Sequence, residues 1–147
     1  MPTGTSSDTV RHTFAAPPFD DATVVDAMRM GVLSCPPDAP LREVARLMAT
    51  HRIHCVVVAE TAGGEPLGVI ADVDIAAAVG SRDAEARLLA RTEPVTVRPD
   101  DSLEHAAQLM AEHDVTHLVV VHPDTRHPVG ILSALDIAGV LAWEGTA

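Results

Sequence analysis

Two hydrophobic patterns alternate along this chain. Residues 41–48 carry apolar side chains at helical spacing, so one face of a helix there belongs to a core. Residues 55–59 form a continuous valine-rich run that is too short for a helix and is typical of a strand buried on both faces. Apolar runs at 33–35 and 67–70 predict two more strands, and 74–79 predicts a second helix. The pattern therefore predicts a βαββα unit.

The same pattern returns at a shift of 62 residues. From the pair 37/99 to the pair 78/140, 15 of 42 positions are identical without a gap, which indicates a tandem duplication. The second copy predicts strands at 95–97, 118–121 and 129–132. Because about 60 residues bury too little surface to be stable alone, we expect the two copies to pack on one another. The predicted fold class is α+β, with the two repeats related by a pseudo-twofold axis.

The duplication also predicts the domain boundaries. We expect a flexible leader at 1–20, a first domain at 21–80, a linker at 81–93 and a second domain at 94–144. The linker contains a short helical pattern at 83–89, and a matching piece at 23–28 precedes the first copy.

Acidic side chains lie near several predicted helix N-termini. Asp38 and Asp100 are placed to cap, or to open the first turn of, the helices that follow them. Ser133 can cap the last helix, with Asp136 near the positive end of its dipole. This structural role for Ser133 and Asp136 stays open beside any role in binding.

Composition narrows the function classes. The net charge is −11, all 10 basic residues are arginine and only 2% of residues are aromatic, which argues against nucleic-acid polymers as partners. A hydrophobic content of 47% excludes wholesale disorder. No apolar run approaches a membrane span of about 18 residues and no secretory signal is visible, so we expect a cytoplasmic protein without membrane contact.

The metal and thiol chemistry of the chain is sparse. Cys35 and Cys55 form neither a CxxC pair nor a cluster, so we expect two reduced core thiols. The eight histidines include no HExxH pattern, and we expect no metal. The sequence shows neither a nucleophilic triad nor a carboxylate pair, and we therefore expect no catalysis.

The third strand of each copy runs into a similar segment, GVIADVD at 68–74 and GILSALD at 130–136. With the VVDAM segment and the helices DAPLREVARLM and DDSLEHAAQLM, these pieces resemble a tandem pair of CBS domains, the Bateman module, over residues 24–141. The family signature is Gly, two aliphatic residues, Thr or Ser, any two residues and Asp. Both copies keep the order of these pieces.

The resemblance implies an adenosine site between the repeats. It implies that Asp136 accepts hydrogen bonds from ribose hydroxyls, that Ser133 bonds a phosphate and that aliphatic residues near a first strand enclose adenine. A carboxylate can take two hydroxyl donors at once, which agrees with the ribose role. The ligand-binding residues predicted in this way are Gly130, Ser133, Asp136, Val95, Thr96, His117, Asp74 and His54.

The first copy departs from that signature. Ala71 stands where Ser or Thr is expected and Asp72 follows it, while Asp74 keeps the ribose position. A phosphate there would lose a donor and meet a negative charge. We therefore predict unequal sites, with the Asp74 site empty or holding a ligand without phosphate there, such as S-adenosylmethionine.

Two histidines stand beside the predicted sites. The resemblance implies that residues leading into the valine strands face the central cleft, where His54 and His117 would meet phosphate. A plain histidine at a strand edge is the alternative.

The function predicted from these features is regulatory. We expect a module that binds AMP, ADP, ATP or S-adenosylmethionine without turnover, signals occupancy to an unknown protein partner and forms a homodimer through the repeat helices, as the resemblance implies. The alternative is an interaction or structural homodimer with vestigial nucleotide sites.

Overall fold

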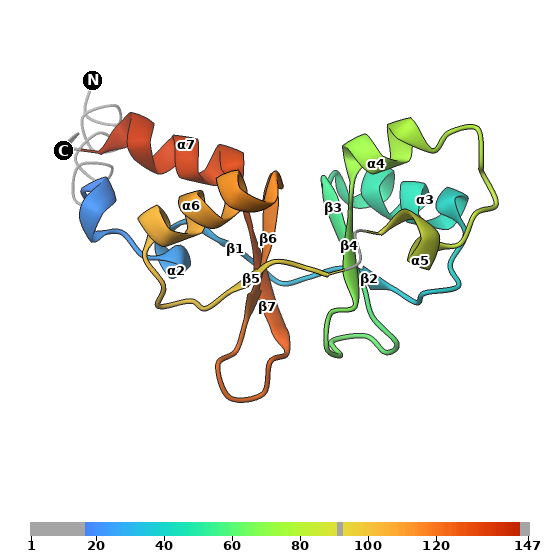
Figure 1. Cartoon of the computed structure of the whole chain (residues 1–147), viewed down its shortest axis with the longest axis horizontal. Coiled ribbons are helices and arrows are strands. Elements are labelled where there is room, and N and C mark those ends of the chain that lie inside the picture. The colour runs from blue at the N-terminus through green and yellow to red at the C-terminus, as the bar shows by residue number, and fades with distance from the viewer. Residues whose placement is uncertain (1–16, 91–92, 145–147) are drawn as a thin grey trace, which may run out of the picture.

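A computed structural model of the chain describes residues 17–90 and 93–144. It consists of two α/β bodies side by side, one for each sequence repeat (Figure 1). This arrangement confirms the predicted fold of two packed βαββα repeats. Most of the predicted leader, residues 1–16, lies outside the described residues. None of the helices in the described part of the chain is long and apolar enough to cross a membrane.

The first repeat has a three-stranded sheet covered by helices. The sheet order is β2-β3-β4, with β2 parallel and β4 antiparallel to the central β3. Its elements are β2 (Ser34–Cys35), α3 (Leu41–His51), β3 (Cys55–Val58), β4 (Gly68–Ala71) and α4 (Asp72–Ala77).

The second repeat has the same order of elements and one additional strand. Its sheet order is β1-β7-β6-β5, and the added β1 comes from the segment that precedes the first repeat. The elements are β1 (Arg29–Met30), β5 (Thr96–Val97), α6 (Leu103–His113), β6 (His117–Val121), β7 (Pro128–Ser133) and α7 (Ala134–Trp143). The sequence pattern did not predict β1, because it has only two residues and both are exposed.

The segments that precede the repeats cross over. Helix α2 (Val24–Ala27) packs on the second repeat, after the short 3-10 turn η1 (Phe19–Asp21), and α5 (Ala86–Leu89) packs on the first repeat (Figure 1). Backbone hydrogen bonds repeat at the same shift of 62: Val24 N–H donates to the Asp101 carbonyl (2.8 Å), and Ala86 N–H donates to the Ala39 carbonyl (2.7 Å). The segment that precedes the first repeat therefore completes the second repeat, and the segment that precedes the second repeat completes the first.

The core consists of three apolar clusters. Each repeat has one such cluster beneath its helices. The third joins the two sheets face to face and consists of Cys55, Val57, Val69, Val119 and Val121. The valine strands are thus buried on both faces, as their continuous apolar runs predict. The repeats pack on one another through this third cluster.

The predicted caps at Asp38 and Asp100 are wrong. Helix α3 begins after Pro40 without a side-chain cap, and α6 is capped by Ser102, whose Oγ accepts from the His105 N–H at 3.0 Å. Both aspartates lie in the turns before these helices, too early for the cap position. Asp100 instead pairs with Arg98 at 3.3 Å.

Gly130 has a packing role in this fold. It lies in β7 opposite Met30 of β1, and a Cβ added to it would come within 2.5 Å of the Arg29 carbonyl oxygen. Only glycine lets β1 approach this closely. Because β1 carries Arg29 and Met30 to the cleft described next, Gly130 acts on that cleft through the backbone.

Candidate functional site

Two cavities lie between the repeats, and the duplication relates them. The larger has a volume of about 730 Å³ and contains Ser133 and Asp136. The smaller, about 70 Å³, contains their counterparts Ala71 and Asp74. Small-molecule sites usually span about 300–1,000 Å³, so only the larger cavity has room for a nucleotide as it stands. We call them the large cleft and the small cavity.

Each cavity is lined by both repeats. The large cleft takes its signature residues from β7 and α7, and its opposite wall from the end of α3 and the start of β3. The small cavity takes its signature residues from β4 and α4, and its opposite wall from residues 114–117. The crossover segments complete each site, with residues 29–33 in the large cleft and residues 93–95 in the small cavity.

Ser133 and Asp136 form a reciprocal capping box at the start of α7. The Ser133 N–H donates to Asp136 Oδ2 at 2.9 Å, and the Asp136 N–H donates to Ser133 Oγ at 3.1 Å. The structural role expected for this pair is therefore present. It still leaves the Ser133 hydroxyl proton and the second carboxylate oxygen, Oδ1, available to a ligand, because the bonds engage only Oγ as an acceptor and Oδ2.

Arg29 is a site residue that sequence analysis missed. Its Nε lies 3.7 Å from Asp136 Oδ1, and its side chain is 68% exposed whereas that of Asp136 is 12% exposed. The guanidinium therefore supplies a mobile positive charge at the mouth of the large cleft. No local pattern marks Arg29, because it reaches Asp136 only through the pairing of β1 with β7.

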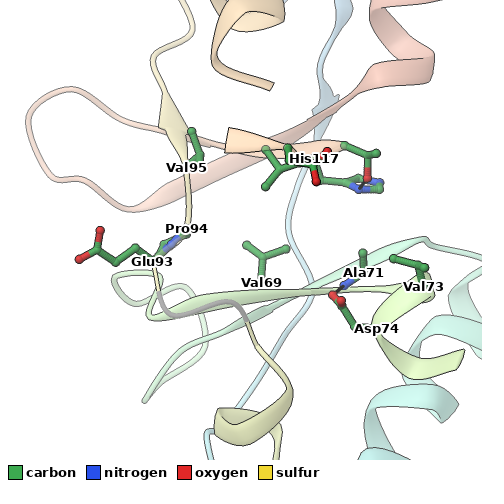
Figure 2. Close-up of a pocket in the computed structure, with 11 residues that line it drawn as sticks. Val69, Ala71, Val73, Asp74, Glu93, Pro94, Val95 and His117 are labelled. Atoms are coloured by element: carbon green, nitrogen blue, oxygen red, sulfur yellow. Dashed lines mark hydrogen bonds between the residues drawn. The ribbon is translucent and has the colours of Figure 1, made fainter. Parts of the chain in front are cut away.

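The small cavity is built around Asp74. The Ala71 N–H donates to Asp74 Oδ2 at 2.8 Å, which repeats half of the second box, but the methyl group of Ala71 cannot accept the return bond. Figure 2 shows Ala71 and Asp74 opposite His117, with Val95 and Pro94 from the crossover segment at one side. The predicted inequality of the two sites thus has a structural basis in both volume and donors.

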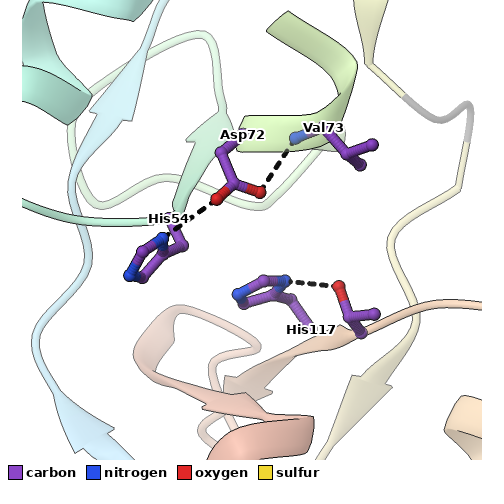
Figure 3. Close-up of polar contacts among 5 residues, drawn as sticks. His54, Asp72, Val73 and His117 are labelled. Carbon is purple, nitrogen blue, oxygen red and sulfur yellow. Dashed lines mark hydrogen bonds and ion pairs between the residues drawn. The ribbon is translucent and has the colours of Figure 1, made fainter. Parts of the chain in front are cut away.

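The sequence suggested that Asp72 lies beside the Asp74 site, but the structure places it elsewhere. It lines the large cleft, not the small cavity, and its Oδ2 lies 3.0 Å from His54 Nδ1 (Figure 3). The expectation that Asp72 adds charge to the Asp74 site is therefore wrong. Residues two apart in a helix diverge by about 200°, so Asp72 and Asp74 face opposite cavities. The hydrogen bond from His54 holds the pKa of Asp72 below its usual value, and Asp72 is ionised at neutral pH.

His117 faces this pair from the second repeat (Figure 3). Its Nδ1 lies 2.9 Å from Thr116 Oγ1, and it lines both cavities. Burial lowers the pKa of His117, an effect that the Asp72 carboxylate partly offsets. His54 and His117 thus both line the large cleft, but they are not repeat equivalents, because the shift of 62 pairs His54 with Thr116.

The other predicted ligand residues are distributed over the two sites. Val95 borders the small cavity beside Asp74, and Thr96 and Gly130 lie in strands and line neither cavity. The crossover explains the place of Val95, since the segment before the second repeat serves the first repeat's signature. The aliphatic residues beside Asp136 instead are Met30, Val32, Leu33, Ile53, Ile131 and Leu135.

The two cysteines are free and buried, as predicted for core thiols. Burial raises the pKa of Cys35 to about 11 and that of Cys55 to about 12. Although Cys55 lines the large cleft, its thiol stays protonated at neutral pH and is a poor nucleophile. Across residues 17–90 and 93–144, no group of three or more His, Cys, Asp or Glu side chains is arranged to hold a metal ion.

Comparison with known proteins agrees with this architecture. A model of the CBS domain family matches residues 22–81 and 86–142. The chain belongs to the CBS domain family. The CBS domain-containing protein YhcV of Bacillus subtilis (strain 168) is 34% identical to this CBS pair over 121 residues, which cover 80% of this chain and 84% of that protein. Another relative is the homoserine O-acetyltransferase of Methanocorpusculum labreanum, and this chain matches only 23% of the length of that protein.

Solved CBS pairs share the fold of this chain. The CBS domain protein PAE2072 from Pyrobaculum aerophilum, complexed with AMP, is 30% identical with a TM-score of 0.70, over 82% of this chain and 98% of that one. The CBS domain pair of protein MJ0100, in complex with 5′-methylthioadenosine and S-adenosyl-L-methionine, has a TM-score of 0.75 at 22% identity, over 82% of this chain and 96% of that one.

Proposed function

We propose that this CBS pair is a regulatory module that binds one adenosine-containing ligand per chain in the large cleft. The observation that carries the proposal is a carboxylate fixed by a helix cap on the wall of a 730 Å³ cleft, whose second oxygen, Asp136 Oδ1, is engaged only by the exposed Arg29 at 3.7 Å. Two ribose hydroxyls can donate to such a carboxylate at once. The AMP complex of a 30% identical CBS protein supports adenosine as the ligand class.

The cleft walls suit the two ends of an adenosine ligand. Exposed apolar side chains, Met30 (77% exposed) and Leu135 (72% exposed), flank the cleft and would be covered by an adenine ring. Arg29 supplies a charged donor at its mouth, and the imidazole rings of His54 and His117 line its polar wall. AMP, ADP, ATP and S-adenosylmethionine all contain the adenosine part that these groups recognise.

Binding without turnover is the activity that we propose. In the large cleft the Cys55 thiol is protonated, Asp136 belongs to a helix cap and Asp72 pairs with His54, and we assign no catalytic role to these groups. We propose that occupancy is signalled to a protein partner; both repeats line the cleft, so a ligand there would contact both of them. The reduced state of both thiols fits the cytoplasmic location that we propose.

A thermal-shift panel tests the proposal. At about 100 times its dissociation constant, a bound ligand stabilises the fold by about 2.7 kcal/mol, which raises Tm by several degrees for a chain of this length. We expect that shift with at least one of AMP, ADP, ATP and S-adenosylmethionine, and none with guanosine monophosphate at the same concentration. A flat response to the whole adenosine panel would leave the vestigial-site alternative, to which Ala71 and the 70 Å³ cavity already point for the first site.

We also propose that two copies pair through α4 and α7. Neither helix contains a fully buried residue, and the two lie on the same side of the molecule (Figure 1). Two exposed apolar residues on this side are related by the shift of 62: Val79 (58% exposed), in the turn just after α4, and Leu141 (56% exposed), in α7. A twofold dimer brings the same patch of both copies together, so this face would meet its own counterpart in a second copy. Burying it would remove these side chains from water.

A further inference from the structure

The charge of the large cleft depends on histidines. Its fixed charges are one arginine, Arg29, against two aspartates, Asp72 and Asp136, which gives a net charge of −1 when the histidines are neutral. Three histidines line the same cleft, namely His51, His54 and His117. Histidine is the side chain that changes charge between pH 5 and 8. Protonation of all three would change the cleft from −1 to +2.

His54 is the histidine whose protonation changes what the cleft offers a ligand. A carboxylate only accepts hydrogen bonds, so the 3.0 Å contact requires that His54 Nδ1–H donate to Asp72 Oδ2. In the neutral ring, Nε2 is then an acceptor and repels a phosphate oxygen. Among the described residues, nothing hydrogen-bonds to Nε2. Added there, a proton turns that nitrogen into a charged donor.

Several charged and titratable groups surround His54 in the large cleft. The titratable and charged groups that share the cleft with it are His51 from α3, Cys55 from β3, Asp72 from α4, His117 from β6, Asp136 from α7 and Arg29 from β1. Asp74 lies on the far side of α4 and lines the small cavity instead. The nearest charge is Asp72, which stabilises a protonated His54 but repels a phosphate as long as His54 is neutral.

We propose that the His54–Asp72 pair makes ligand choice in the large cleft proton-linked: a phosphorylated adenosine binds with proton uptake at His54 and gains affinity as the pH falls, whereas adenosine itself does not. The inference rests on the proposed adenosine site. It adds a regulatory input, since mild acidification would shift the module toward phosphorylated ligands. His117 contributes less near neutral pH, because burial lowers its pKa.

Calorimetric titration with AMP and with adenosine tests the inference. We expect the affinity ratio of AMP to adenosine to rise about fivefold from pH 8.0 to pH 6.5, within the limit of tenfold per pH unit for one proton. At pH 7.5, titrations in buffers of different ionisation enthalpy should show net proton uptake with AMP and none with adenosine. An unchanged ratio together with adenosine binding would overturn the inference and leave the proposed function standing. Absence of binding by both ligands would overturn both.

Matched variants assign the effect to the pair. His54→Gln should remove most of the wild-type pH dependence of the AMP-to-adenosine ratio and most of the proton uptake; its side chain is 66% exposed, so the fold should tolerate the change. Comparing variants with the same ligand cancels the titration of the AMP phosphate itself, whose second pKa is near 6. Asp72→Asn should raise AMP affinity at pH 8.0 about threefold by removing a repulsive charge.

The control is His113→Gln. His113 ends α6 as the repeat equivalent of His51 and lines neither cavity. It should keep the wild-type pH profile. An equal loss of pH dependence in His113→Gln and His54→Gln would contradict the assignment to the cleft.

Discussion

Asp136→Ala is expected to reduce the affinity for the adenosine ligand about 100-fold and to abolish the thermal shift at concentrations that saturate the wild-type protein. A hydrogen bond to a charged group contributes about 1.5–3 kcal/mol, and the variant loses the bonds to both ribose hydroxyls. Every 1.4 kcal/mol corresponds to a factor of ten in affinity. Asp136 Oδ2 also accepts from the Ser133 N–H, so the variant should lose about 1 kcal/mol of folding stability as well.

Asp74→Ala is the matched control, because it separates binding from capping. Asp74 occupies the equivalent position and accepts from the Ala71 N–H at 2.8 Å, so its removal costs a similar cap. It borders only the small cavity, and ligand affinity should stay within about twofold of wild type. If Asp74→Ala weakened binding as much as Asp136→Ala does, the ligand would not be in the large cleft.

The double variant Val79→Glu/Leu141→Glu is expected to convert the proposed dimer into a monomer. The two side chains are 58% and 56% exposed and equivalent in the two repeats, so each dimer interface would receive four carboxylates at apolar positions. Burying an unpaired charge costs several kcal/mol, more than such an interface can retain. Sedimentation velocity should show a species of 15.4 kDa in place of one of about twice that mass.

Leu88→Glu controls for the general effect of an added surface charge. Leu88 is 75% exposed on α5, outside the proposed interface, and its replacement should leave the dimer intact. A wild-type protein that sediments as a monomer at micromolar concentration would contradict the pairing through α4 and α7. So would a dimer that survives in the double variant.

The duplication explains why so much of the fold could be predicted. Helical spacing at 41–48 and the valine run at 55–59 are local signals that read the same way twice, and both copies fold as they indicate. Local signals do not show which short helix packs on which repeat. Residues 23–28 and 83–89 read as short helices, but no local pattern shows that each serves the other repeat. That choice depends on long-range contacts.

Part of the candidate site could also be predicted from the sequence. Ser133, Asp136, His54 and His117 do meet in one cleft, because each lies at the end of a well-marked element. Arg29 was missed because a two-residue strand pairs it with β7 from a distance in sequence. Asp72 was assigned to the wrong cavity because a linear motif does not show that two neighbouring aspartates point to opposite sides of a helix.

Titration calorimetry of the wild-type CBS pair with AMP at pH 6.5 gives the most direct measurement of how the two sites differ. The 730 Å³ cleft and the 70 Å³ cavity predict a single class of site with one ligand per chain. Two equivalent ligands per chain would show that Ala71 and the small cavity do not matter for binding. If neither AMP nor any other adenosine ligand bound, the large cleft would serve another purpose.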